Sequence, residues 1–244
     1  MKTKTVSITI ALLAGLFSSA TQAVETSKWQ VSGDATLTTN YVFRGISQTS
    51  RGPAVQVTFA TEHTSGLYAS VWASNVNFGE GSLEVDGTLG WRGQLSASTS
   101  LDTGVIYYHY PEEASADEYD YAEIFAALDI YQFTFGLHHS DNYFGAGVGS
   151  YQYLYLSAPI FDYDGWQLSI SAGYNRFSSA SDYASFLGAP VNNDRDYWDG
   201  QLTLSRDFAD GWSSSISYVN TSVSSAQCGA DCGSQWLLNL SRSF

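Results

Sequence analysis

Strict alternation of apolar and polar residues recurs in short segments along this chain, and it limits the possible folds more than any other feature. The first segment, Trp29–Phe43, sets Val31 and Leu37 between polar neighbours, and the last, Gln235–Phe244, follows the same pattern. A period of two indicates β-strands with one apolar and one polar face. Similar segments lie near 54–62, 67–76, 83–92, 101–110, 121–129, 131–139, 151–160, 166–177, 197–206 and 212–221. The pattern predicts an all-β fold, a transmembrane antiparallel β-barrel of about 12 strands.

The connections between these segments alternate in length. Longer ones are expected after the odd-numbered strands, and they include 47–53, 111–120, 140–150, 178–196 and 222–234. Tight turns follow the even-numbered strands at 64–66, 162–165 and 207–211. Long loops at one end and short turns at the other are typical of outer-membrane barrels.

The two faces of the strands predict which side of the barrel meets lipid. The apolar faces end in aromatic residues such as Trp29, Trp212 and Trp236, while charged residues gather on the polar faces. In lipid the exterior must be apolar, and aromatic residues belong at the membrane interfaces. This favours a membrane barrel with a polar lumen over a secreted soluble barrel.

Composition excludes several other classes of protein. The 244-residue chain carries 24 acidic and 10 basic residues, a formal charge of −14, and is 15% aromatic. Nucleic-acid binding requires a basic surface, so no nucleic-acid partner is expected. Disordered chains are poor in aromatic residues. No apolar run after the first 25 residues reaches the roughly 20 that a membrane-spanning helix needs.

The N-terminus has the organisation of a secretory signal peptide. Lys2 and Lys4 precede the apolar stretch Val6–Phe17, and small residues lead up to Ala23. Residues 1–23 are therefore expected to be a cleaved signal peptide and residues 24–244 the barrel, exported to the outer membrane of a Gram-negative cell. In an exported chain, the spacing of Cys228 and Cys232 predicts a small disulfide loop.

Four stretches carry a family resemblance. Asn40-Tyr-Val-Phe-Arg-Gly-Ile-Ser-Gln-Thr, near the start, resembles the opening strand and loop of the TorF family of proteobacterial porins. Val71-Trp-Ala-Ser-Asn-Val-Asn-Phe-Gly and Val105-Ile-Tyr-Tyr-His-Tyr-Pro fall where that family has similar stretches, and Tyr119-Asp-Tyr-Ala-Glu is also similar. The resemblance spans essentially the whole mature chain. It implies an outer-membrane barrel with a channel role.

Charged residues predicted to face the lumen are the main functional candidates. Strand parity turns seven of them inward: Asp34, Arg44, Glu62, Glu84, Asp86, Arg92 and Glu123. Rings of charged side chains select ions in a pore, and this excess of acids predicts a weak cation preference. The expected constriction sets Arg44 and Arg92 opposite Asp34, Glu84, Asp86 and Glu123. In the competing interpretation, Arg44 and either Glu84 or Asp86 form salt bridges that fill a narrow lumen.

Catalytic and metal sites are not expected. The stretch His138-His139-Ser140-Asp141-Asn142 invites a hydrolase interpretation, but adjacent residues on a strand point to opposite faces and the chain has no Gly-x-Ser-x-Gly elbow. The acidic stretches 111–120 and 191–196 do not match an EF-hand loop. We therefore predict a non-enzymatic protein without a metal or other cofactor.

These features together predict a porin-like channel for passive diffusion of small hydrophilic solutes. The alternative is a closed structural or surface-interaction barrel whose lumen is filled by side chains. The expected partners are outer-membrane lipids and lipopolysaccharide, together with the barrel-assembly machinery, which would recognise the terminal Phe244.

Overall fold

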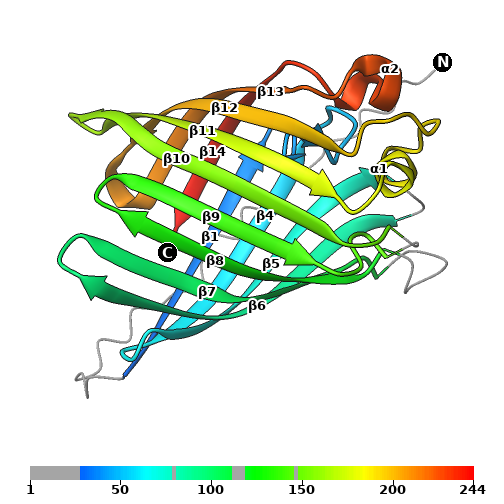
Figure 1. The fold of residues 1–244 in the computed structure, drawn as a ribbon. Helices are drawn as coiled ribbons and strands as arrows, with labels where there is room; N and C mark the ends of the chain where they lie inside the picture. Colours follow the sequence, from blue (N-terminus) through cyan, green and yellow to red (C-terminus); the bar gives the residue numbers. More distant parts are fainter. Residues whose placement is uncertain (1–27, 79–80, 112–118, 146–147) are drawn as a thin grey trace, which may run out of the picture.

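The computed structural model describes residues 28–78, 81–111, 119–145 and 148–244. These residues form one closed β-barrel, drawn in Figure 1. The predicted signal peptide, residues 1–23, lies outside the described residues.

Twelve antiparallel strands form the barrel wall, which confirms the predicted fold class. In chain order they are β1 (Trp29–Thr38), β4 (Ala54–His63), β5 (Leu67–Phe78), β6 (Gly81–Ser96), β7 (Thr99–His109), β8 (Tyr121–Ile130), β9 (Phe133–Ser140), β10 (Tyr151–Tyr163), β11 (Trp166–Phe177), β12 (Asp196–Asp207), β13 (Trp212–Thr221) and β14 (Gln235–Ser243). Each strand pairs with its neighbours in sequence, and β1 pairs with both β4 and β14. The last pairing closes the sheet, so no strand edge is left along the wall.

The terminal residue reinforces the seam between β1 and β14. The backbones of Gly33 and Phe244 exchange two hydrogen bonds of 3.0 Å. The Phe244 ring lies so close to Gly33 on the outer surface that a Cβ at this position would come within 2.6 Å of it. The ring also meets Phe59 of β4 edge-on. The C-terminal residue thus covers a glycine of β1 and packs against the next strand.

The two ends of the barrel differ as expected. Long connections at one end, here called the loop end, carry α1 (Ala180–Leu187), α2 (Ser225–Cys228) and the short 3-10 helix η2 (Gly229–Asp231) (Figure 1). Short turns, one of which contains η1 (Ala209–Gly211), join the strands at the other end, here called the turn end. No helix in the described ranges is long and apolar enough to cross a membrane.

One predicted long connection is wrong. A long segment was expected after each odd-numbered barrel strand, but β5 and β6 follow each other closely. Their pairing continues through Asn75 and Leu83 and, past an irregularity, reaches Phe78 and Gly81. Because the ladder extends almost to the connection itself, little chain is left to form a loop.

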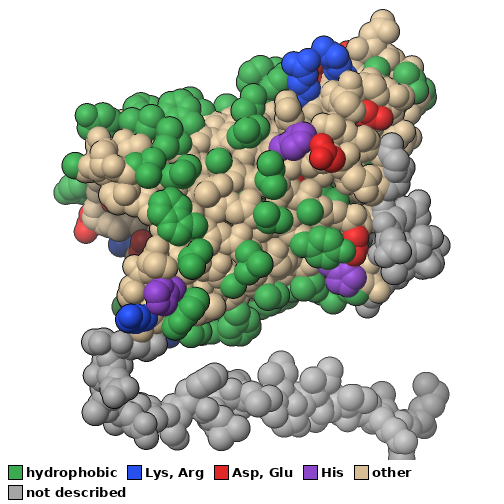
Figure 2. Space-filling view, turned by 60° about the horizontal axis from the view of Figure 1, so that its bottom comes forward, with side chains coloured by type: hydrophobic (Ala, Val, Ile, Leu, Met, Phe, Trp, Pro, Cys, Tyr) green, Lys and Arg blue, Asp and Glu red, His purple; other side chains and the backbone are tan. Residues whose placement is uncertain are grey.

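The exterior of the barrel wall is apolar. Large side chains stand exposed on every part of it, among them Val31, Phe59, Leu89, Ile124 and Leu238. Figure 2 shows such side chains distributed over the face that it presents. Water would not favour this surface, whereas lipid requires it of a spanning barrel, in which all backbone groups are paired.

The first strand is shorter than the alternation predicts. It ends at Thr38, and Val42–Phe43 (β2) pairs instead with Ile46–Ser47 (β3) in a small hairpin apart from the wall. The hydroxyls of Ser47 and Thr49 donate to Asn40 Oδ1, at 2.7 and 3.0 Å, and so turn the chain back on itself. Arg44 consequently lies at the tip of this hairpin rather than on a barrel strand, which corrects the predicted position.

Candidate functional site

The β2–β3 hairpin reaches across the lumen near the loop end. Its tip consists of Arg44 and Gly45, both with positive φ, 48° and 83°. A Cβ at Gly45 would lie 2.8 Å from Asp199 Cβ and 2.9 Å from Thr221 Cβ, so the tip touches β12 and β13. The Arg44 side chain points to β8, where Glu123 receives it. The hairpin therefore bridges strands on separate parts of the wall.

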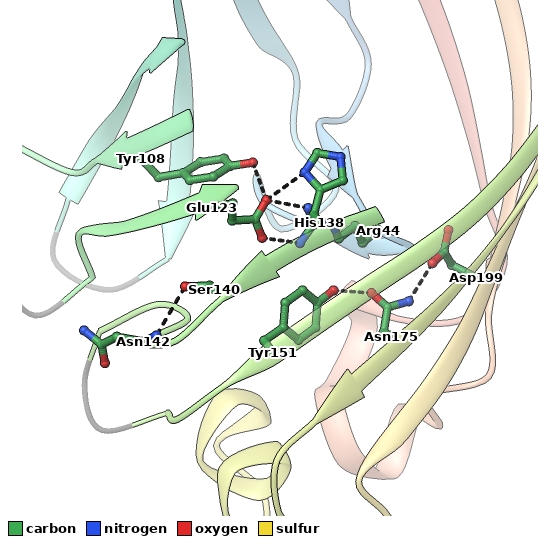
Figure 3. A network of polar contacts seen from close by, with 9 residues as sticks. All are labelled: Arg44, Tyr108, Glu123, His138, Ser140, Asn142, Tyr151, Asn175 and Asp199. Atoms are coloured by element: carbon green, nitrogen blue, oxygen red, sulfur yellow. Dashed lines mark hydrogen bonds and ion pairs between the residues drawn. The ribbon is translucent and has the colours of Figure 1, made fainter. Parts of the chain in front are cut away.

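Glu123 is the anchor of this bridge. Arg44 Nη1 and Nη2 donate to its two carboxylate oxygens, each at 2.7 Å. The Tyr108 hydroxyl donates to Glu123 Oε2 at 3.0 Å, and His138 Nδ1 lies 3.1 Å from the same atom (Figure 3). Only 1% of Glu123 is exposed. A bidentate pair with further hydrogen bonds is the arrangement that allows opposite charges to be buried together.

Aromatic side chains fill the space around the Arg44 guanidinium. Its Cζ lies 4.5 Å from the ring centroids of both Phe43 and Tyr153, and 5.2 Å from that of Tyr151. Tyr151 stacks on Tyr143 with centroids 3.8 Å apart. Burial raises the pKa of the Tyr143 hydroxyl, against the opposing effect of Arg44.

These rings belong to a larger buried cluster that closes the loop half of the lumen. It also contains Tyr108, Tyr110, Tyr121, Phe144, Phe177, Tyr183 and Tyr197. Tyr151 has no exposed surface at all. Its hydroxyl donates to Asn175, whose amide donates to Asp199 at 2.7 Å (Figure 3).

Two contacts fix the base of the hairpin to the barrel and its loops. The Asn40 amide donates to Gln235 Oε1 on β14 at 2.5 Å. Arg51 donates to the backbone carbonyls of Ala230 and Cys232, the latter at 2.8 Å. Cys232 is bonded to Cys228 in a disulfide, with Cα atoms 5.8 Å apart. The disulfide loop thus serves as a cap that holds the hairpin from outside.

The turn half of the lumen has a different character. Arg92 Nη2 donates to Asp102 Oδ2 at 2.8 Å, and its Nη1 lies 3.5 Å from Glu62 Oε2. The Tyr68 hydroxyl donates to Asp102 Oδ1 at 2.7 Å. The side chains of Arg92 and Glu62 are 52% and 45% exposed, so water reaches this group of charges.

A second part of the turn half is hollow and polar. A cavity of about 320 Å³ lies there against β9 to β12. Its polar lining consists of Gln132, Thr134, Ser157, Gln167, Ser169, Ser171, Gln201 and Thr203. Hydroxyl and amide groups of this kind can hydrogen-bond water or a polar solute.

The seven candidate lumen residues do not form one constriction. Arg44 meets Glu123 in the loop half, while Arg92 meets Glu62 in the turn half. Asp34 stays apart from both arginines and contacts Thr36 within its own strand, at 3.4 Å. The arrangement of both arginines opposite one set of acids is therefore wrong, because the arginines lie at different depths of the barrel.

The remaining two candidates, Glu84 and Asp86, lie buried on β6. Neither forms a salt bridge with Arg44 in the described part of the chain, so the salt bridges of the filled-lumen interpretation are wrong in their partner. Arg44 binds Glu123, one of the four acids that the predicted constriction set opposite the two arginines. A partner across the lumen cannot be read from the parity of either strand.

Several contributing residues were missed by the sequence analysis. Asp102, Asp129 and Asp199 all point inward and take part in hydrogen bonds. The same alternation that selected Glu123 could have found Asp102, which shares its strand face with the buried Tyr108.

The suggested catalytic stretch is divided between the two faces of β9. His138 contacts Glu123 in the lumen, whereas His139 Nε2 lies 3.0 Å from the exposed Asp141. The Ser140 hydroxyl accepts a hydrogen bond from the Asn142 backbone at 3.3 Å. No three His, Cys, Asp or Glu side chains among the described residues are grouped to hold a metal ion.

Comparison with solved structures finds barrels of porins. The KdgM porin aligns with a TM-score of 0.56 at 9% identity, over 87% of this chain and 99% of that one. KdgM in complex with disordered oligogalacturonate gives 0.55 at 8% identity, over 88% and 98%. The NanC porin gives 0.53 at 9% identity, over 88% and 99%. At these identities the likeness concerns the fold.

Comparison of sequences gives the family. No curated protein matches the chain significantly. One family profile matches residues 22–244, which is nearly the whole sequence. The more specific resemblance to the TorF porins remains a prediction. The chain belongs to the Gcw_chp family, described as bacterial proteins of unknown function.

Proposed function

We propose that this protein is a porin-like channel of the outer membrane through which small hydrophilic solutes diffuse passively. The observation that carries the proposal is the polar, hollow turn half of the lumen inside a barrel with an apolar exterior. A barrel that only anchors or displays loops has no need of such a cavity. The shared fold of the KdgM and NanC porins supports the same function.

The location and partners follow from the same proposal. The apolar wall would contact outer-membrane lipids, and the loop end would meet lipopolysaccharide. Phe244, exposed at the seam, is available for recognition by the barrel-assembly machinery. The N-terminal segment, residues 1–23, would direct export and be cleaved. The TorF-type resemblance of residues 40–49 fits this assignment.

Cation preference is a further part of the proposal. In the turn half, Glu62, Asp102 and Asp129 line the lumen with Arg92 as their basic counterpart. Arg44 contributes little to the electrostatic field in the lumen, because Glu123 neutralises its charge. Acidic walls attract cations and repel anions. An anionic saccharide such as the oligogalacturonate of KdgM is therefore not the solute that we propose here.

A second candidate function is a closed barrel with a structural or surface-interaction role. The packing around the hairpin tip favours it, since Arg44, Tyr143, Tyr151 and Phe177 are packed together there. If the protein is a channel, the hairpin must move, or the side-chain packing around it must loosen, before solutes can pass. The two functions thus differ in whether the loop half opens.

Single-channel recording in planar bilayers separates them. The purified barrel should give discrete openings, and a salt gradient should give a reversal potential biased toward cations. A variant in which a Gly-Ser linker replaces residues 41–48 should conduct several times more current, because the bridge across the lumen is gone. A folded barrel that stays silent in both forms would support the closed structural role. Anion-biased openings would retain the channel and refute its cation preference.

A further inference from the structure

Two buried carboxylates in the lumen wall lack a positive partner. Glu84 and Asp86 lie on the same face of β6, two residues apart, and are only 2% and 8% exposed. Arg44 is already paired with Glu123, and no salt bridge in the described ranges reaches either acid. Buried ionised carboxylates require a counter-charge, and two side by side repel each other.

Their hydrogen bonding is also incomplete. The Tyr110 hydroxyl donates to Glu84 Oε1 at 3.0 Å, but Glu84 Oε2 and Asp86 Oδ1 have no hydrogen-bond partner in the described structure. Buried polar atoms almost always have a hydrogen-bond partner, so two buried carboxylate oxygens without one require an explanation. Neither residue takes part in the Arg44–Glu123 bridge that closes the lumen.

The surroundings offer further oxygen atoms. Glu84 is opposite Ser74 across the strand pair, and Ser74 is buried. The Tyr41 side chain of the hairpin segment lies beside both acids: burial, and next the charges of Glu84 and Asp86, raise the pKa of its hydroxyl. Tyr41 packs in turn on Trp72, with ring centroids 5.3 Å apart. The acids are thus enclosed by hydroxyl groups and aromatic rings.

We infer that Glu84 and Asp86 together bind one hard divalent cation of the calcium type. One such ion would neutralise the charges of the two carboxylates, and the oxygens without a hydrogen-bond partner would coordinate it. Calcium accepts irregular sets of oxygen ligands, whereas magnesium demands near-ideal octahedral geometry and retains its water. Because Tyr41 precedes the β2–β3 hairpin, a bound cation would also tie that segment to the wall. The inference needs the barrel fold only and does not depend on channel activity.

Terbium luminescence tests this site directly. Tb³⁺ is a hard, oxygen-preferring probe similar to Ca²⁺, and nearby Trp72 and Tyr41 would sensitise its emission. The folded barrel in detergent should show saturable emission that Ca²⁺ displaces. Asp86→Asn and Glu84→Gln should each weaken Tb³⁺ binding at least tenfold. Asp129→Asn is the matched control, because this inward carboxylate already accepts hydrogen bonds from Ser100 and Thr134.

Thermal unfolding separates the cation from the main alternative, a proton held on one of the acids. Ca²⁺ should raise the melting temperature of the native barrel and of Asp129→Asn, but not that of Asp86→Asn. If Ca²⁺ leaves the native protein unchanged while Asp86→Asn alone stabilises it, the acids hold protons and the inference is wrong. Equal Tb³⁺ emission from all variants would also overturn it, since the signal would then come from surface acids.

Discussion

The same twelve strands line both halves of the lumen, but the charged residues are buried in one half and exposed to water in the other. In the loop half, Arg44 and Glu123 are buried and held in a bidentate pair among aromatic rings. In the turn half, Arg92 pairs with Glu62 and Asp102 in contact with water. The difference comes from the hairpin together with inward aromatic residues of the wall, such as Tyr151, and of other loops, such as Tyr143, which pack with it in the loop half. Added segments and wall residues therefore decide together where the lumen is closed.

Removing one member of the buried pair should have the largest effect. Glu123→Leu leaves the Arg44 charge buried without a partner, which costs about 3–5 kcal/mol when the charge cannot escape. We expect a large drop in the melting temperature, which can be measured by circular dichroism in detergent. The double variant Arg44→Met with Glu123→Leu should recover most of the loss. Equal stability of the single and the double variant would contradict the closed loop half.

A side chain at the tip of the hairpin should have the next largest effect. Gly45→Val places a Cβ against Asp199 and Thr221 and forces a residue with φ of 83° into an unfavourable conformation. A loss of about 1–3 kcal/mol is typical of such overpacking and strain. Displacement of the tip should also increase single-channel current. Gly87→Val is the control, because nothing lies within 4 Å of its added Cβ.

Loss of the disulfide should weaken the loop half moderately. Cys228→Ser with Cys232→Ser opens a very short loop, so the entropic destabilisation falls at the low end of the usual range, about 1–2 kcal/mol. The Arg51 contacts with the carbonyls of Ala230 and Cys232 should loosen with it. Hydrogen exchange at residues 40–53 would then become faster. Unchanged exchange there would show that the cap does not hold the hairpin.

A substitution in the turn half should change the stability least and the ion selectivity most. Arg92→Gln removes an exposed ion pair, and such pairs contribute about 0–1 kcal/mol. The melting temperature should therefore stay nearly constant, while the reversal potential in a salt gradient shifts further toward cations. A melting-temperature loss as large as that of Glu123→Leu would remove the distinction between the halves.

The fold could be predicted from the sequence because a barrel strand shows its two faces in consecutive residues. The same alternation continued from Trp29 to Phe43, however, and could not reveal that the strand ends at Thr38. That break depends on Asn40, Ser47 and Thr49, whose hydrogen bonds form only when the chain folds back. Alternation is a property of strands in general, so it does not tell a wall strand from a hairpin.

The site was predictable in its residues but not in its pairings. Strand parity selected both Glu123 and Arg44, although Arg44 lies at the tip of the hairpin and not on a barrel strand. Their contact joins residues 79 positions apart across the lumen, which no periodicity encodes. Glu84 and Asp86 were selected by the same parity, yet the lack of a salt-bridge partner for them among the described residues became evident only once Arg44 was placed on Glu123.

Cysteine labelling on a single strand tests the divided lumen most directly. Thr134 and Ser140 both point inward from β9; Thr134 lines the polar cavity, and Ser140 lies buried at the loop end. Since the native cysteines are joined in a disulfide, Thr134→Cys and Ser140→Cys each introduce one free thiol. A small, water-soluble methanethiosulfonate should label Cys at 134 at least tenfold faster than at 140. Equal rates at the two positions would show that the loop half is as open as the turn half, and would contradict this account.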